Sequence, residues 1–81
     1  ILIELSKDEN WLVRGSVARN PNLPFQQLIQ LSKDNHDSVR AHSTLNHQLP
    51  LEVLLELSND KYEFVRNQAK LARINRISLL K

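Results

Sequence analysis

The chain has 81 residues, of which 41% are hydrophobic and 25% charged, and its formal net charge at pH 7 is +2. This length suits one small domain, and the absence of cysteine excludes disulfides, thiolate-bound metals and a cysteine nucleophile. Because a chain without cysteine is typical of a reducing compartment, we expect a cytoplasmic protein. No strictly apolar run exceeds three residues, which argues against a membrane-spanning segment, and the single glycine, Gly15, excludes a glycine-rich phosphate-binding loop.

The chain repeats itself at an offset of 26 residues. A Leu-Ser-x-Asp motif and a Val-Arg pair both recur, the motif at 5–8, 31–34 and 57–60 and the pair at 13–14, 39–40 and 65–66. Ten of 26 positions are identical between residues 5–30 and 31–56, with no gap. We therefore define unit 1 (5–30), unit 2 (31–56) and an atypical unit 3 (57–81) of a single domain. Residues 1–4 are expected to end a preceding unit, which would make the chain a fragment of a longer array.

Each unit predicts two short helices. Two of the first helices are predicted to begin at Pro24 and Pro50, because proline suits the first position of a helix. The second helices are predicted to open at Asp8, Asp34 and Asp60, because aspartate is a good N-cap. The apolar spacing of both kinds of helix predicts a continuous core. Its members are Leu5, Val13, Val17, Leu28, Leu31, Val39, Leu54, Leu57, Val65 and Ala69.

Two helices of this length cannot bury their apolar faces alone, so neighbouring units must stack. The sequence therefore predicts an all-α fold, an α-solenoid of about three two-helix repeats, and no sheet.

Unit 1 carries the residues of a known motif. Its Leu-Ser-Lys-Asp is followed by Trp-Leu-Val-Arg and by Val-Ala-Arg-Asn-Pro-Asn-Leu-Pro, a string that resembles the leucine-rich repeat variant (LRV) motif. The likeness covers nearly the whole chain, although His47 replaces a proline of the motif and unit 3 keeps only Asp60 and Val65-Arg66. Asp-x₄-Val-Arg is also similar to part of HEAT-like repeats. The resemblance implies a right-handed superhelix in which some helices are 3₁₀, and it carries no catalytic residue.

HEAT-like repeats use an aspartate and an arginine of this kind as a hydrogen-bonded ladder between units. Each unit of this chain holds the same six-residue spacing from Asp to Arg. We therefore expect Arg14, Arg40 and Arg66 to reach an aspartate within or between units. Their expected partners, which should also accept backbone N–H groups at the start of the second helices, are Asp8, Asp34 and Asp60.

The resemblance implies a fold and not a function, because some HEAT-like proteins are scaffolds while others bind DNA or carry active sites. We expect a non-enzymatic scaffold that binds another protein through a concave face lined by the second helices. The positions on that face that the Val pattern leaves unburied are Trp11, Gly15, Arg19, Ala41, Leu45, Asn67, Lys70 and Leu71. Trp11 and Arg19 are the candidates in unit 1, because tryptophan is a favoured anchor at interfaces. The alternative for Trp11 is packing against the preceding repeat.

Charge is distributed unevenly along the chain. Residues 1–65 have a net charge of −3, whereas residues 66–81 have a net charge of +5 and no acid. Arg66, Lys70 and Arg73 fall on one helical stripe. This stripe is interpreted either as the polar outer surface of a C-terminal cap or as a contact surface for nucleic acid or another acidic partner.

In the cap interpretation the last helix runs on, because unit 3 lacks the proline that follows the second helix in unit 1. Leu71, Ile74 and Ile77 are predicted to form the inward face of this extension.

No cofactor, metal or small-molecule substrate is expected. Ser6, Ser32 and Ser58 recur with the repeat, which indicates a structural role, whereas a nucleophile is needed once and beside a base. His36, His42 and His47 are not spaced to share one helical face, and they would be the first suspects if a metal were bound.

Overall fold

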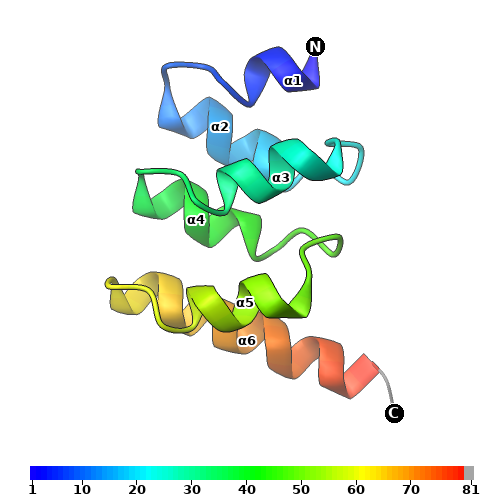
Figure 1. Cartoon of the computed structure of the whole chain (residues 1–81), viewed down its shortest axis with the longest axis vertical. Coiled ribbons are helices and arrows are strands. Elements are labelled where there is room, and N and C mark those ends of the chain that lie inside the picture. Colours follow the sequence, from blue (N-terminus) through cyan, green and yellow to red (C-terminus); the bar gives the residue numbers. More distant parts are fainter. Residues whose placement is uncertain (80–81) are drawn as a thin grey trace.

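The computed structural model describes residues 1–79, which form six α-helices (Figure 1). The helices are α1 (Leu2–Leu5), α2 (Trp11–Ala18), α3 (Phe25–Leu31), α4 (Asp37–Ser43), α5 (Leu51–Leu57) and α6 (Glu63–Leu79). No strand occurs in this part of the chain, so the all-α prediction is confirmed. The expectation of 3₁₀ helices is wrong for residues 1–79, because every helix there is α-helical.

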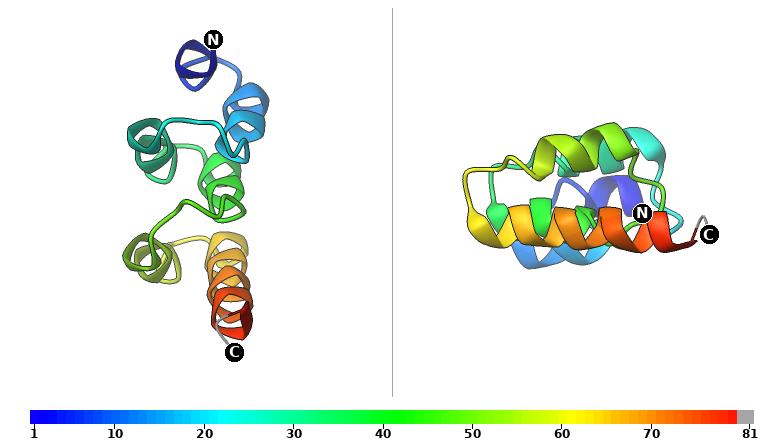
Figure 2. Two further views of the ribbon diagram at one scale, coloured as in Figure 1. Left: turned by 90° about the vertical axis from the view of Figure 1, so that its right-hand side faces the viewer. Right: turned by 90° about the horizontal axis from the view of Figure 1, so that it is seen from below.

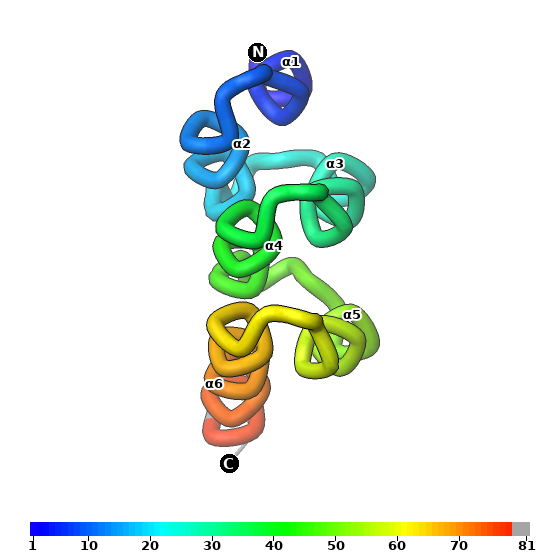
Figure 3. The backbone as a smooth tube through the Cα atoms, turned by 90° about the vertical axis from the view of Figure 1, so that its left-hand side faces the viewer, coloured from blue at the N-terminus to red at the C-terminus, as the bar shows by residue number. Residues whose placement is uncertain are grey.

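The helices form two layers. The second helices α2, α4 and α6 stack along the long axis, and the first helices α3 and α5 lie to one side of this stack (Figures 2 and 3). Helix α4 contacts both α2 and α6, while α5 packs on α6 and α3 touches α2 and α4. The molecule measures 36 × 26 × 16 Å, with α1 and α6 at opposite ends of the long axis.

Proline and serine mark the two ends of the first helices. Pro24 and Pro50 occupy the N-cap positions of α3 and α5 with ψ angles of 143° and 152°, so each proline lies one residue before the position predicted for it. At the other end, the recurring serine donates its hydroxyl to the carbonyl three residues earlier. The Ser6, Ser32 and Ser58 hydroxyls are each 2.6 Å from that oxygen.

The second helices begin three residues after each aspartate, so the predicted aspartate N-caps are wrong. Asn10 caps α2, and the imidazole of His36 caps α4 by accepting from the Ser38 N–H at 3.1 Å. The aspartates instead shape the preceding turn, each accepting from the backbone N–H two residues later. These distances are 2.8 Å for Asp8, 2.9 Å for Asp34 and 3.0 Å for Asp60.

The core runs through both layers and contains most of the predicted residues. Leu5 and Val13 are only half-buried, because no unit packs on their side of the stack in the described structure. Leu23 and Leu49, the leucines of the two Leu-Pro pairs, are 1% and 0% exposed although the sequence analysis left them out of the core. They lie in the connections from the second helices to α3 and α5 and are covered by both layers.

Helix α6 has 17 residues, against eight in α2 and seven in α4, as the missing proline predicted. Its predicted inward face is wrong: Leu71, Ile74 and Ile77 are 54%, 58% and 51% exposed. The inward line instead runs through Val65 and Ala69 to half-buried Ala72 and Arg76.

Candidate partner-binding site

Charged ladders fix the distance and register between neighbouring units. The Arg14 guanidinium in α2 binds the Asp34 carboxylate with Nε at 2.9 Å and Nη2 at 3.1 Å. Arg40 in α4 binds Asp60 in the same way, at 2.8 and 3.2 Å. Each arginine thus reaches the aspartate of the following unit in a two-pronged geometry that a lysine cannot reproduce.

The same arginines are also anchored within their own units. The Nη1 atoms of Arg14 and Arg40 each donate to a backbone carbonyl six residues earlier, that of Asp8 or Asp34, at 2.7 Å. Arg66 makes the equivalent bond to the carbonyl of Asp60 at 2.8 Å. Among residues 1–79, no carboxylate forms an ion pair with Arg66.

Burial and hydrogen bonding shift the pKa of Asp60 in opposite directions. Burial raises the pKa of this carboxyl, but the hydrogen bonds from Arg40 and from the Tyr62 N–H, together with the charge of Arg40, hold the pKa below its ordinary value. The hydrogen bond to Asp60 likewise raises the pKa of Arg40. Both members of the pair are therefore ionised at neutral pH, so that the positive Arg40 guanidinium faces the negative Asp60 carboxylate.

A second ladder, which the sequence analysis missed, lies at the other end of the second helices. Buried Asn46 donates its side-chain amide to the carbonyls of Ala18 and Asn20 in unit 1, at 2.9 and 3.0 Å. Unit 3 has Ala72 at the position of Asn46, and Arg76 takes over: its guanidinium donates to the carbonyls of Asn46, at 3.1 Å, and Leu49. The recurrence of Asn20 and Asn46 was the available signal.

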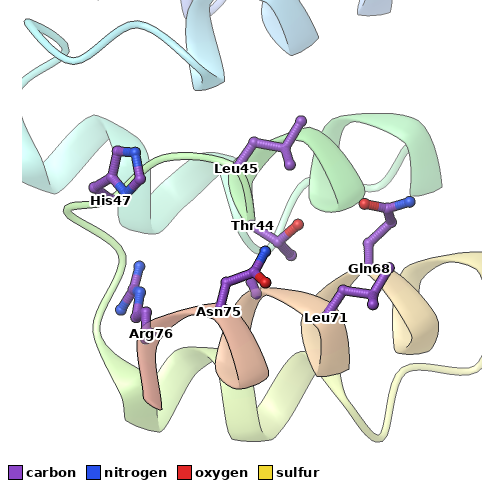
Figure 4. A pocket seen from close by; sticks show the side chains of 8 residues that line it. Thr44, Leu45, His47, Gln68, Leu71, Asn75 and Arg76 are labelled. Atoms are coloured by element: carbon purple, nitrogen blue, oxygen red, sulfur yellow. The ribbon is translucent and has the colours of Figure 1, made fainter. Parts of the chain in front are cut away.

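A groove follows the contact between α4 and α6. Its larger part, about 220 Å³, is lined by Thr44, Leu45, His47, Gln68, Leu71, Ala72, Asn75 and Arg76 (Figure 4). A smaller part of about 100 Å³ shares Leu45 and Gln68 and is also lined by Ala41, His42 and Phe64. We call the two together the α4–α6 groove. Leu45, Phe64 and Leu71 are 51%, 56% and 54% exposed, so the groove presents apolar surface to solvent.

The lining of the α4–α6 groove contains no carboxylate. Arg76 brings a positive charge, and burial lowers its pKa from the ordinary value. Its two described hydrogen-bond acceptors are neutral carbonyl oxygens, and no carboxylate among residues 1–79 forms an ion pair with it. Gln68 and Asn75 add amide donors and acceptors beside the apolar side chains.

Trp11 and Arg19, the candidate contact residues of unit 1, have different surroundings. Trp11 is 36% exposed and stacks on His36, with ring centroids 4.2 Å apart and planes 14° from parallel. It therefore packs against the following unit. Arg19 is exposed at the C-cap of α2 and lies outside the α4–α6 groove.

Gly15 and Ala41, both proposed for the open face, are buried. The neighbouring unit covers Gly15: a Cβ atom on it would lie 2.8 Å from His42 Nδ1. Of the positions proposed for the open face, Ala41, Leu45 and Leu71 line the groove. Phe64, Gln68 and Asn75, which the sequence analysis did not name, also line it.

The basic stripe is less uniform than its sequence suggested. Lys70 is exposed, Arg73 is half-buried, and Arg66 is half-buried and bound to the Asp60 carbonyl. Exposed Ile74 and Ile77 lie on the same helix and interrupt the basic surface.

Within residues 1–79, no three His, Asp or Glu side chains are arranged to hold a metal ion. The three histidines lie apart: His36 caps α4, the Nδ1 of His42 is buried without a hydrogen-bond partner, and His47 is exposed in the connection after α4. None of the described helices combines the length and apolar character needed to cross a membrane.

Comparison of the chain with protein-family models, with curated proteins and with solved structures finds no match. The site is therefore interpreted from its geometry alone.

Proposed function

We propose that this chain is a right-handed α-solenoid module of the LRV or HEAT-like kind that binds another protein on the open face of its second helices. The α4–α6 groove is the observation that carries this proposal. It places three half-exposed apolar side chains, Leu45, Phe64 and Leu71, side by side along an elongated hollow. An apolar hollow with a few polar groups at its edge is the common form of a peptide-binding groove.

The charges around the groove specify the partner further. Arg76, His42 and His47 belong to the lining of the groove, and no acid lines it. A partner segment that combines apolar side chains with an aspartate or glutamate is complementary to this surface. Its apolar groups would cover Leu45 and Leu71, and its carboxylate would approach Arg76.

A non-enzymatic role is supported by what the repeated polar residues do. The hydroxyls of Ser6, Ser32 and Ser58 are engaged with helix carbonyls, and Asp34 and Asp60 are engaged with arginines. Because these groups already form structural hydrogen bonds and ion pairs, we propose no catalytic role for them.

The proposal is tested by selecting peptides on the full 81-residue chain from a random display library and titrating the selected peptides by calorimetry. Selected sequences should combine apolar with acidic residues. Leu71→Glu should weaken their binding at least tenfold, whereas the matched control Leu55→Glu, on the first-helix layer and 47% exposed, should leave it unchanged. Equal binding to both variants would contradict the groove.

The alternative is a nucleic-acid-binding solenoid that uses the basic stripe, supported by exposed Lys70 and half-buried Arg73. In that case a single-stranded oligonucleotide should bind with an affinity that falls steeply with added salt and on the change Lys70→Glu. Peptide binding in the groove should not depend on Lys70.

A further inference from the structure

The open face of the second helices continues past the α4–α6 groove onto α2. Leu45 and Leu71, which line the groove, occupy equivalent positions of units 2 and 3, and the equivalent position of unit 1 is Arg19. The backbone turn after α2 repeats the turn after α4, because the N–H groups of Asn20 and Asn46 each donate to the carbonyl three residues earlier, at 2.9 and 3.2 Å. We call Arg19, Leu45 and Leu71 the anchor column.

The anchor column forms one line along the stack. The Arg14–Asp34 fork has distances of 2.9 and 3.1 Å, and the Arg40–Asp60 fork has distances of 2.8 and 3.2 Å. Unit 1 is therefore placed on unit 2 as unit 2 is placed on unit 3. Because α2, α4 and α6 are stacked along the long axis (Figure 3), the three anchor positions follow one another in the direction of that axis.

The anchor column offers one cation and two apolar side chains to a partner. Arg19 is exposed, and no carboxylate among residues 1–79 forms an ion pair with it. Leu45 and Leu71 are 51% and 54% exposed. A chain that lies along the column would thus meet one positive charge and then two apolar contacts.

The spacing of the anchors selects the conformation of the bound chain. Packed helices have axes about 8–10 Å apart, so successive anchors lie at about that separation. A polyproline II segment rises about 3.1 Å per residue with three residues per turn, so every third side chain points the same way after about 9 Å. In a β-strand the side chain three residues on points to the opposite face, and an α-helix needs about six residues for the same distance.

Polar side chains beside the anchor column suit the same conformation. The positions three residues before the anchors hold Ser16, His42 and Gln68, none of which is acidic. Residues three apart are neighbours on a helix surface, so this polar row runs next to the anchors. A polyproline II backbone has no internal hydrogen bonds, and the Ser16 hydroxyl and the Gln68 amide can bond to it.

We propose that the partner segment binds in the polyproline II conformation across α2, α4 and α6. The carboxylate of an aspartate or glutamate lies on Arg19, and apolar side chains three and six residues away from it lie over Leu45 and Leu71. This inference rests on the proposed peptide-binding function and specifies the partner of that face. The carboxylate at Arg19 is additional to the one expected at Arg76.

The test uses the peptides selected on the full 81-residue chain and measures their binding by calorimetry. The selected sequences should share an acidic residue with apolar residues three and six positions away. Arg19→Glu should weaken their binding on the order of tenfold or more, because it replaces a charge-assisted hydrogen bond by repulsion. The matched control Lys33→Glu makes the same change of charge at an exposed position in the turn after α3 and should leave binding unchanged. Both positions are exposed, so both variants should remain folded by circular dichroism.

Two changes in the peptide complete the test. Replacing its acidic residue by lysine should weaken binding to the wild-type chain and restore binding to the Arg19→Glu chain. Inserting one alanine between the acidic residue and the nearest apolar residue should weaken binding to the wild type. The same insertion should change binding to Arg19→Gln little, because the acidic residue has no charged partner to lose there.

The outcomes separate this inference from the function on which it rests. Peptides that need Leu71 but bind the Arg19→Glu chain like the wild type overturn the inference and leave the groove in place. Peptides whose apolar residues follow a helical spacing do the same. A chain that selects no peptide, or whose peptides bind the Leu71→Glu variant like the wild type, overturns both.

Discussion

The Arg40 side chain in α4 donates two hydrogen bonds to the Asp60 carboxylate, from Nε at 2.8 Å and from Nη2 at 3.2 Å, and both side chains are only 10% exposed. A third bond, from Nη1 to the carbonyl of Asp34, fixes the guanidinium from its own unit. One arginine thus ties together the turns that precede α4 and α6. The relationship between units depends on this group as much as on apolar contact.

Removing the arginine should therefore cost more than removing an exposed charge. We expect Arg40→Ala to lower the free energy of unfolding by about 1–3 kcal/mol, because the Asp60 carboxylate loses its charged donors while remaining shielded from water. Arg40→Lys should restore only part of this loss, since an ammonium cannot reproduce the fork. Urea denaturation measures the effect, with exposed Lys33→Ala as the control. A midpoint for Arg40→Ala equal to that of the control would refute the role of the pair.

The lowered pKa of Asp60 makes stability dependent on pH. The folded chain holds this carboxyl below its ordinary value of 3.8, so the pair stabilises the fold fully above that value. The contribution is lost as the pH falls through 3.8 and then through the lower pKa of the folded state. Asp60→Asn should be less stable than the wild type at pH 7, and the difference should shrink at acidic pH. Thermal unfolding between pH 7 and pH 2 measures both chains, and parallel curves would contradict the assignment.

The amide ladder is tested by Asn46→Ala. This change leaves the carbonyls of Ala18 and Asn20 without their side-chain donor and also removes the acceptor for the Gln48 N–H. We expect a loss of about 1–3 kcal/mol in the free energy of unfolding, because these groups lie in a buried or half-buried setting. Exposed Asn22→Ala is the matched control and should change stability by less than about 0.5 kcal/mol. Chemical denaturation separates the two outcomes.

The 26-residue recurrence was sufficient to predict the helices and which equivalent positions of the units are polar. It did not predict which atoms of these residues form hydrogen bonds. Asp8 and Asn10 are both good capping residues, and only the backbone geometry assigns the turn to the aspartate and the cap to the asparagine. The face of α6 beyond Ala69 was predicted wrongly because bulky Leu71 and Ile74 outweighed Ala72 in the apolar pattern. Close packing between helices selects the small residues, which a hydrophobicity pattern ranks low.

For a related reason, the sequence predicted only some of the residues that line the α4–α6 groove. Leu45 and Leu71 share one column of the repeat and were among the contact positions expected on the open face, whereas Phe64 belongs to a column occupied by Leu12 and Ser38. A single unusual residue in a column gives no periodic signal. Its significance follows from its position across from His42, which only the packing of α4 on α6 reveals.

Gly15 gives the last prediction, because two opposing effects meet there. Alanine is the better helix former by about 1 kcal/mol, so Gly15→Ala in the interior of α2 would ordinarily stabilise the fold. Here the new Cβ would lie 2.8 Å from His42 Nδ1, closer than atoms can approach, so the imidazole in α4 must move. We expect Gly15→Ala to destabilise the wild-type chain and to stabilise the His42→Ala variant, in which the obstructing ring is absent. Thermal unfolding of the four chains of this double-mutant cycle measures the coupling, and a change of the same sign in both backgrounds would show that the His42 ring does not determine the effect of the new methyl group.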